Sequence, residues 1–214
     1  DVAAVDRFFS DMCTPAGSDT CDKELVVFFP KLLGYAMAGE GMRHFVIAHG
    51  GGMNAKSTLM ALYSLVLGRP FFVGIAAKVL LKSGPASSTG SATPELMPLL
   101  AARVAVFAES TTKEPLNDKT IKKATGGDLM AARPLYGKTI NFVCKALMFL
   151  LTNHMPSMNT NDQAMIDRLV TIPFLARFEE TKEGKAFVDS LKTLPKLDAL
   201  FALLLRGARA VYAN

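Results

Sequence analysis

The chain has 214 residues, half of them hydrophobic and a fifth charged, with a net charge of +5 at pH 7. This composition excludes a disordered chain, and the mild positive charge permits nucleic-acid binding without proving it. No apolar run reaches the roughly 18–20 residues of a membrane-spanning helix, so we expect no membrane partner. Three widely spaced cysteines suit neither a disulfide framework nor a zinc site and indicate reduced thiols.

Helical spacing dominates the first forty residues. Apolar side chains recur at intervals of three to four residues from Val2 to Met12, and a second helix is predicted from 22 to 37, after a loop around Pro15 and Gly17. We therefore expect an N-terminal helical segment over residues 1–40.

A phosphate-binding loop is predicted between a buried strand over 44–48 and a helix over 57–67, the context that such a loop requires. The segment fits G-x-x-x-x-G-K-[ST], except that Ala55 replaces the last glycine. Ala55 should cost of order 1 kcal/mol if its φ is positive, and so weaken nucleotide binding. The alternative is a glycine-rich turn with an unrelated lysine. The candidate nucleotide-binding residues are Gly50, Gly51, Gly52, Met53, Asn54, Ala55, Lys56, Ser57 and Thr58.

The chemistry expected of this loop is the binding of ATP and Mg²⁺. Glycines let backbone N–H groups face a phosphate, and the helix that follows adds its positive N-terminus. Lys56 would pair with the β- and γ-phosphates, and the Ser57 hydroxyl would hold Mg²⁺.

Apolar strands alternate with helices over the rest of the chain, which predicts an α/β fold with a parallel sheet covered on both faces. We expect the core to span residues 41–178 and a C-terminal helical segment to span 179–214. The further predicted elements are a mobile surface loop (83–94), a short helix (94–100), a strand (103–108), a helix (117–124), an inserted hairpin (129–143), a strand (146–151) and a closing helix (191–213).

Five ordered motifs resemble the superfamily-3 helicase domains of the primase-helicases of large DNA viruses and phages, which have an AAA+ core. The resemblance covers nearly the whole chain. The motifs are Leu33-Gly34-Tyr35 with the phosphate loop, the strand ending at Glu109, Thr125-Gly126-Gly127-Asp128 with Arg133 and Tyr136, Thr152-Asn153-His154-Met155-Pro156, and Asp162 with Arg168 and Pro173-Phe174.

The resemblance implies three catalytic residues. Glu109 ends a strand that we expect beside the phosphate-loop strand, so it would activate the attacking water and share Mg²⁺ with Ser57. The amide of Asn153 would bond the γ-phosphate and that water. Arg168 would be an arginine finger for a neighbouring subunit's ATP. The alternatives are a solvated glutamate, a turn asparagine, and a salt bridge from Arg168 to Asp162 or Asp167.

DNA contacts are implied for the hairpin, which in this family grips single-stranded DNA. Lys138 and Tyr136 at its tip supply a cation for phosphate and a ring for base stacking. Lys122, Lys123 and Arg133 would add positive charge to the same region. The alternative is a solvated charged face.

The resemblance thus implies a helicase motor of viral replication that hydrolyses Mg-ATP and moves 3′ to 5′ along single-stranded or forked DNA. It would work as a hexamer, at a replication site in the host cytoplasm or nucleus, with a primase module upstream in the full-length protein. One alternative is a P-loop phosphotransferase with a small acceptor. Another is a DNA-binding ring scaffold with impaired hydrolysis, for which Ala55 and Ala108 are the reasons.

Overall fold

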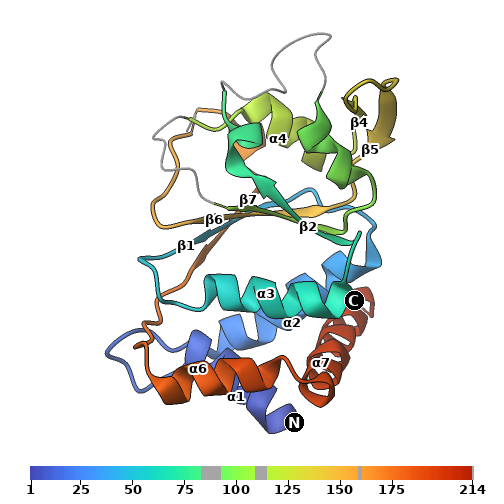
Figure 1. The fold of residues 1–214 in the computed structure, drawn as a ribbon. Helices are drawn as coiled ribbons and strands as arrows, with labels where there is room; N and C mark the ends of the chain where they lie inside the picture. Colours follow the sequence, from blue (N-terminus) through green and yellow to red (C-terminus); the bar gives the residue numbers. More distant parts are fainter. Residues whose placement is uncertain (83–92, 109–114, 159–160, 214) are drawn as a thin grey trace. The chain divides into compact units, whose positions relative to one another are not determined.

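The computed structural model describes residues 1–82, 93–108, 115–158 and 161–213, and has a mixed α/β fold (Figure 1). Its elements form two compact units, each discontinuous in sequence. The helical unit comprises residues 1–38, 50–68 and 173–214, and the sheet unit comprises 39–49 and 69–172.

The helical unit contains five helices, which are α1 (Val2–Met12), α2 (Lys23–Ala38), α3 (Lys56–Leu67), α6 (Lys182–Leu191) and α7 (Leu194–Tyr212). The helices of the sheet unit are the 3-10 helices η1 (Ala77–Leu80) and η3 (Pro94–Leu100) and the α-helices α4 (Asp118–Thr125) and α5 (Gln163–Ile166). Its strands are β1 (Phe45–His49), β2 (Phe72–Ala76), β3 (Val104–Ala108), β4 (Leu129–Ala132), β5 (Ile140–Val143), β6 (Leu147–Thr152) and β7 (Leu169–Pro173). The last residue of β7 belongs to the helical unit.

The main sheet has five strands in the order β2-β3-β6-β1-β7, with parallel pairing of β2 to β3, β3 to β6 and β6 to β1. The prediction that the strand ending at Ala108 lies beside the phosphate-loop strand is therefore wrong, because β6 lies between them. The reason is burial: five of the six residues of β6 are buried, and so continuous an apolar strand belongs at the centre of a parallel sheet.

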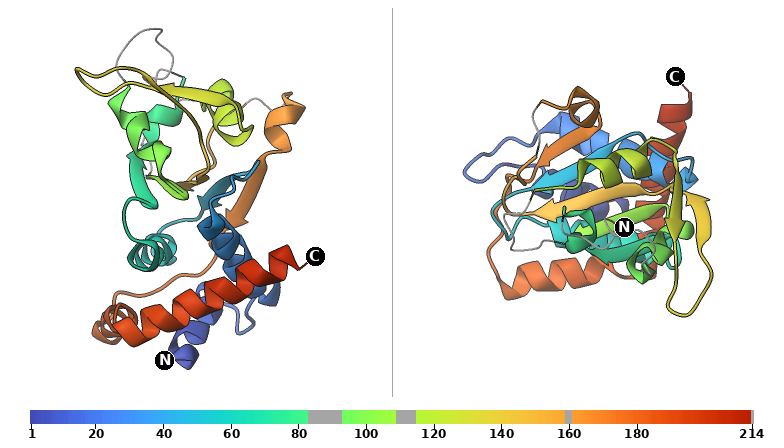
Figure 2. Two further views of the ribbon diagram at one scale, coloured as in Figure 1. Left: turned by 90° about the vertical axis from the view of Figure 1, so that its right-hand side faces the viewer. Right: turned by 90° about the horizontal axis from the view of Figure 1, so that it is seen from above.

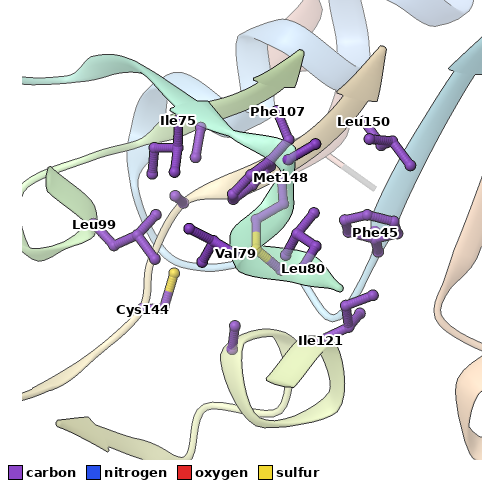
Figure 3. Packing of buried hydrophobic residues seen from close by; sticks show 14 of the residues in the cluster. Phe45, Ile75, Val79, Leu80, Leu99, Phe107, Ile121, Cys144, Met148 and Leu150 are labelled. Atoms are coloured by element: carbon purple, nitrogen blue, oxygen red, sulfur yellow. The ribbon is translucent and has the colours of Figure 1, made fainter. Parts of the chain in front are cut away.

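The sheet unit has its core on one face of this sheet (Figure 3). Alternate residues of three strands point to that face, among them Phe45, Phe107 and Met148, as the two-residue period of a strand requires. Leu99 of η3 and Ile121 of α4 belong to the same cluster. Burial of this face holds together β1, β3 and β6; the phosphate loop follows β1 in the chain, and Asn153 follows β6.

The helical unit is built around the crossing of α2 and α7, and Figure 2 shows α7 lying across α1 and α2. A Cβ added to Gly34 would lie 2.1 Å from the carbonyl oxygen of Leu204, and one added to Gly207 would lie 2.1 Å from that of Pro30. The two backbones therefore touch directly. The buried hydroxyl of Tyr63 donates to the carbonyl of Leu33, which fastens α3 to α2.

Most predicted elements are confirmed, including the hairpin over 129–143, which is β4 and β5 in antiparallel pairing. The sequence analysis missed β2, η1, α5, β7 and α6, and the closing helix begins at Leu194 rather than 191. β2 lacks the apolar pattern that predicts a buried strand, because Gly74 interrupts it and only Ile75 is buried. In α6 only Leu191 is buried. Ten residues of the predicted mobile loop, 83–92, lie outside the described residues.

All three cysteines are free thiols, as predicted. Burial raises the pKa of Cys13 to about 12, with smaller contributions from Cys21 and Asp22, and burial also raises the pKa of Cys144. Both buried thiols therefore stay protonated and unreactive near neutral pH.

Within the described ranges, no helix combines the length and the apolar character that crossing a bilayer demands.

Candidate functional site

The predicted phosphate loop joins the end of β1 at His49 to the start of α3 at Lys56, so the strand, loop and helix order is confirmed. Gly52, Met53 and Ala55 have φ values of +87°, +49° and +66°. These left-handed residues turn the backbone sharply, and they lie where a phosphate loop needs its amides to converge.

Ala55 occupies a conformation that favours glycine, with φ +66° and ψ +5°. A Cβ in this conformation costs roughly 1–2 kcal/mol, which glycine avoids. Glycine in turn loses more conformational entropy on folding, a destabilisation of about 0.5–1 kcal/mol. Ala55→Gly should therefore raise the free energy of unfolding by roughly 0.5–1 kcal/mol. Urea denaturation measures this. The matched control is Ala61→Gly at an exposed position inside α3, which should lower stability by about 1 kcal/mol. Equal losses in both variants would contradict a strained Ala55.

Lys56 is buried, and its ammonium is held over the loop. Its Nζ donates to the carbonyl oxygen of Gly50 at 2.7 Å and to Oδ1 of Asn54 at 3.1 Å. Asn54 is also buried, and its Nδ2 donates to the carbonyl of Phe174 at 3.2 Å. The amide thus has a fixed orientation, with its oxygen toward the lysine.

The segment after β7 packs against the phosphate loop. The amide of Phe178 donates to the carbonyl of Met53 at 2.8 Å. A Cβ on Gly50 would lie 2.3 Å from the carbonyl oxygen of Phe174 and 2.4 Å from Nδ2 of Asn54, so only glycine fits there. Sequence reasoning assigned Asn54 to the loop but missed this bracing role, which depends on a contact 120 residues away.

A pocket of about 880 Å³ opens beside the loop within the helical unit. The ring of Phe187 lies under the guanidinium of Arg7, whose Cζ is 4.8 Å from the ring centroid. Sequence reasoning missed the pocket, because its wall combines α1, α3 and α6. Its lining includes Arg7, Phe8, Asp11, Met53, Ala55, Thr58, Phe178, Glu179 and Phe187.

Asn153 comes directly after β6, at the carboxyl edge of the sheet. The last residues of β1 and β6, His49 and Thr152, are paired in register. Thr152 Oγ1 donates to the carbonyl of His154 at 2.6 Å and accepts from its amide at 3.2 Å, so Asn153 sits in a tight turn. Glu109, predicted to activate water and share Mg²⁺ with Ser57, lies outside the described residues. Ser57 is exposed in the first turn of α3.

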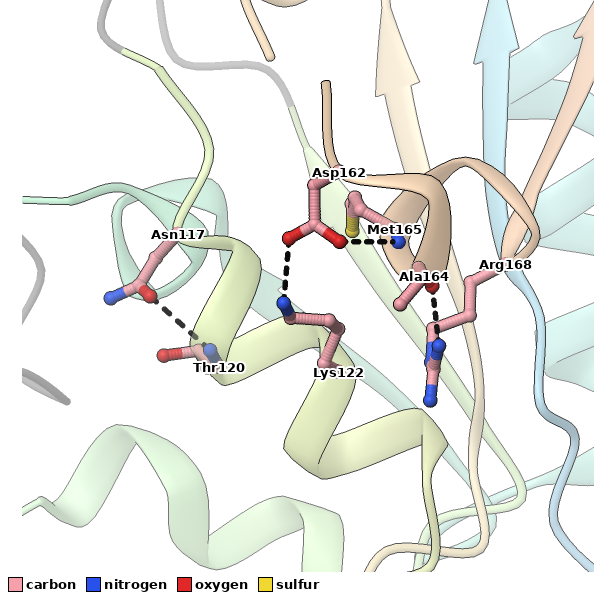
Figure 4. Close-up of polar contacts among 7 residues, drawn as sticks. All are labelled: Asn117, Thr120, Lys122, Asp162, Ala164, Met165 and Arg168. Atoms are coloured by element: carbon pink, nitrogen blue, oxygen red, sulfur yellow. Dashed lines mark hydrogen bonds and ion pairs between the residues drawn. The ribbon is translucent and has the colours of Figure 1, made fainter. Parts of the chain in front are cut away.

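Arg168 lies in the turn between α5 and β7, directly before the first residue of β7, and its Nη1 donates to the carbonyl of Ala164 in the same turn (Figure 4). Asp162 instead pairs with Lys122, and Asp167 accepts from Gln163 at 2.7 Å. The salt bridge considered as an alternative role for Arg168 does not form with either carboxylate.

The predicted DNA-binding residues lie on two elements: Arg133, Tyr136 and Lys138 belong to the hairpin, and Lys122 and Lys123 belong to α4. Tyr136 is fully exposed, with a φ of +60°, and Lys138, Arg133 and Lys123 are also exposed. Lys122 differs, because its ammonium lies 2.6 Å from Asp162. DNA binding by these residues stays a prediction.

The chain has relatives among the proteins of large DNA viruses. No family model matches the chain. It is 33% identical over 169 residues to a protein of Acanthamoeba polyphaga mimivirus named "Putative helicase", and 35% identical over 134 residues to a frog virus 3 protein with the same description. These alignments span 77% and 60% of the chain but only 17% and 13% of the two viral proteins.

Two solved structures share the fold. The C-terminal region of NrS-1 has a TM-score of 0.67 at 13% identity, over 95% of this chain and 45% of that one. The JCV helicase has a TM-score of 0.55 at 12% identity, over 99% of this chain and 60% of that one. The likeness to the two solved structures shows a P-loop NTPase type of fold. The viral relatives, together with the ordered motifs, identify the chain as a viral helicase domain of superfamily-3 type.

Proposed function

We propose that this chain is the ATPase motor of a viral DNA helicase, which hydrolyses Mg-ATP and moves along single-stranded DNA as a hexameric ring. The observation that carries the proposal is the Lys56 ammonium, held over a loop of left-handed residues at the start of α3. A triphosphate would replace the carbonyl of Gly50 as the partner of this ammonium. Backbone amides and the N-terminus of α3 would bind the remaining phosphate oxygens.

The rest of the nucleotide would occupy the pocket beside the loop. Its volume of about 880 Å³ is within the usual range for small-molecule sites. The lining includes Phe178, whose ring would stack on a base, and the carboxylates Asp11 and Glu179, which would accept hydrogen bonds from ribose hydroxyls. Met53 and Ala55 belong both to the loop and to the pocket lining, which supports one continuous nucleotide site.

Hydrolysis would use Asn153, at the carboxyl edge of the sheet, and Glu109, with Arg168 supplied to a neighbouring subunit's ATP. Mg²⁺ would be held by Ser57 and Glu109. The exposed hairpin residues Tyr136 and Lys138 would contact DNA.

The deciding experiment measures phosphate release from ATP with and without single-stranded DNA, on fractions separated by size. We expect turnover in the oligomeric fraction and its stimulation by DNA. Turnover by a monomer that passes phosphate to a small acceptor instead of water would indicate a phosphotransferase. DNA binding by an oligomer without turnover would indicate the impaired scaffold, for which the strained Ala55 is the structural reason.

A further inference from the structure

An ion pair in the sheet unit joins two short helices beside Arg168 (Figure 4). Nζ of Lys122, on α4, lies 2.6 Å from Oδ2 of Asp162, and both side chains are partly shielded from solvent. Asp162 is also the N-cap of α5, where its Oδ1 accepts from the amide of Met165 at 3.1 Å. The two carboxylate oxygens of Asp162 therefore bond to different helices, Oδ2 to Lys122 of α4 and Oδ1 to the first turn of α5. The hydrogen bond from Lys122 lowers the pKa of Asp162, which keeps the carboxylate charged.

The single turn of α5 determines where Arg168 lies. The Arg168 amide donates to the carbonyl of Met165 at 3.0 Å, and its guanidinium donates to the carbonyl of Ala164. On the side of α4, a Cβ added to Gly126 would come within 3.8 Å of Nη2 of Arg168. The guanidinium thus lies between the α5 turn, which Asp162 caps, and the end of the helix that carries Lys122.

The guanidinium has unused donor capacity. Its Nε is buried and has no hydrogen-bond partner in the described part of the chain. A buried donor without a partner is unfavourable unless another state of the molecule satisfies it. An unpaired N–H donor of this kind is available to bond an anionic group in another state of the protein.

We propose that Lys122 and Asp162 act as a pair of positioning residues for Arg168, fixing the α5 turn so that the guanidinium points toward the neighbouring subunit's nucleotide. The inference rests on the proposed function of Arg168. It gives Lys122 a role different from DNA-phosphate binding, because its ammonium is already paired to a carboxylate. A four-residue helix has too little hydrogen bonding of its own to hold such a position without an outside contact.

The test compares Lys122→Met, Asp162→Asn and Arg168→Ala, with Lys122→Arg as the conservative variant. Lys119→Met, at an exposed position of α4, is the matched control. We expect Lys122→Met and Asp162→Asn each to lower kcat for ATP hydrolysis roughly 10- to 100-fold, because a small displacement of a catalytic group has an effect of this size. The KM for ATP and the Kd for single-stranded DNA should stay within about twofold. Lys122→Arg should keep most of the activity, and the double variant should be no worse than either single variant.

Subunit mixing separates positioning from loss of structure. Lys56→Ala subunits carry an intact Arg168, so adding them to Lys122→Met subunits should restore turnover above that of either protein alone. Arg168→Ala subunits should be rescued in the same way. A weaker DNA affinity with unchanged kcat at saturating DNA, or no rescue on mixing, would overturn the role of the ion pair. Full activity of Arg168→Ala would refute the finger and this inference together, whereas loss in Arg168→Ala with full activity in Lys122→Met would refute this inference alone.

Discussion

Lys56→Ala should lower ATP turnover by roughly 100-fold or more, which is the usual cost of removing one preorganised group that stabilises the transition state. The Lys56 ammonium is held at 2.7 Å from the Gly50 carbonyl and 3.1 Å from Asn54. It is therefore already placed over the loop before nucleotide binds. Alanine removes the only side-chain cation between residues 50 and 58 and leaves the backbone amides in place, so weak nucleotide binding should persist while turnover is lost.

Phosphate release at saturating ATP and single-stranded DNA measures this effect, and a fluorescent ATP analogue measures residual binding. The control is Lys23→Ala, which removes a lysine of the same charge from an exposed position in the first turn of α2. Both variants should have the same melting temperature as the unmodified chain. If the unmodified chain and Lys56→Ala give the same background rate, the chain is not a motor, and the impaired scaffold becomes the better account.

Gly34→Val and Gly207→Val should each lower the free energy of unfolding by about 3 kcal/mol or more, at the upper end of the range for overpacked cores. An added Cβ would lie 2.1 Å from a backbone carbonyl oxygen of the facing helix in either case. Backbone atoms cannot rotate away as a flexible side chain can, so α2 and α7 would have to separate. Their contact is the most extensive helix packing in the helical unit, and separation would expose its buried residues.

Urea denaturation followed by circular dichroism measures the loss. The control is Ala202→Val on α7, where the side chain is exposed and only the small helix-propensity difference of about 0.5 kcal/mol applies. Because both glycines lie at one crossing, the double variant should lose less than the sum of the two single losses. Unchanged midpoints in the valine variants would show that the helices do not touch at these positions.

Local patterns were sufficient for the elements that carry the candidate nucleotide site. The apolar run before three glycines predicted β1, the lysine and helical spacing predicted α3, and the motif order indicated the helicase family. The turn near Tyr136 predicted the hairpin. These features depend on neighbours within a few residues, and the intrinsic conformational preferences of those residues therefore determine them.

Tertiary structure decided how these elements combine. Chain order suggested that β3 is next to β1, but β6 takes that place in the sheet. Neither the pairing of Lys122 with Asp162 nor the bond from Asn54 to Phe174 could be inferred, since 40 and 120 residues of chain separate the partners. Such contacts depend on side-chain packing between distant segments, and no periodicity in a single sequence encodes which segments meet. The sequence alone thus indicated the family and predicted the chemistry of its phosphate loop, whereas the contacts that support that loop and Arg168 depend on the folded chain.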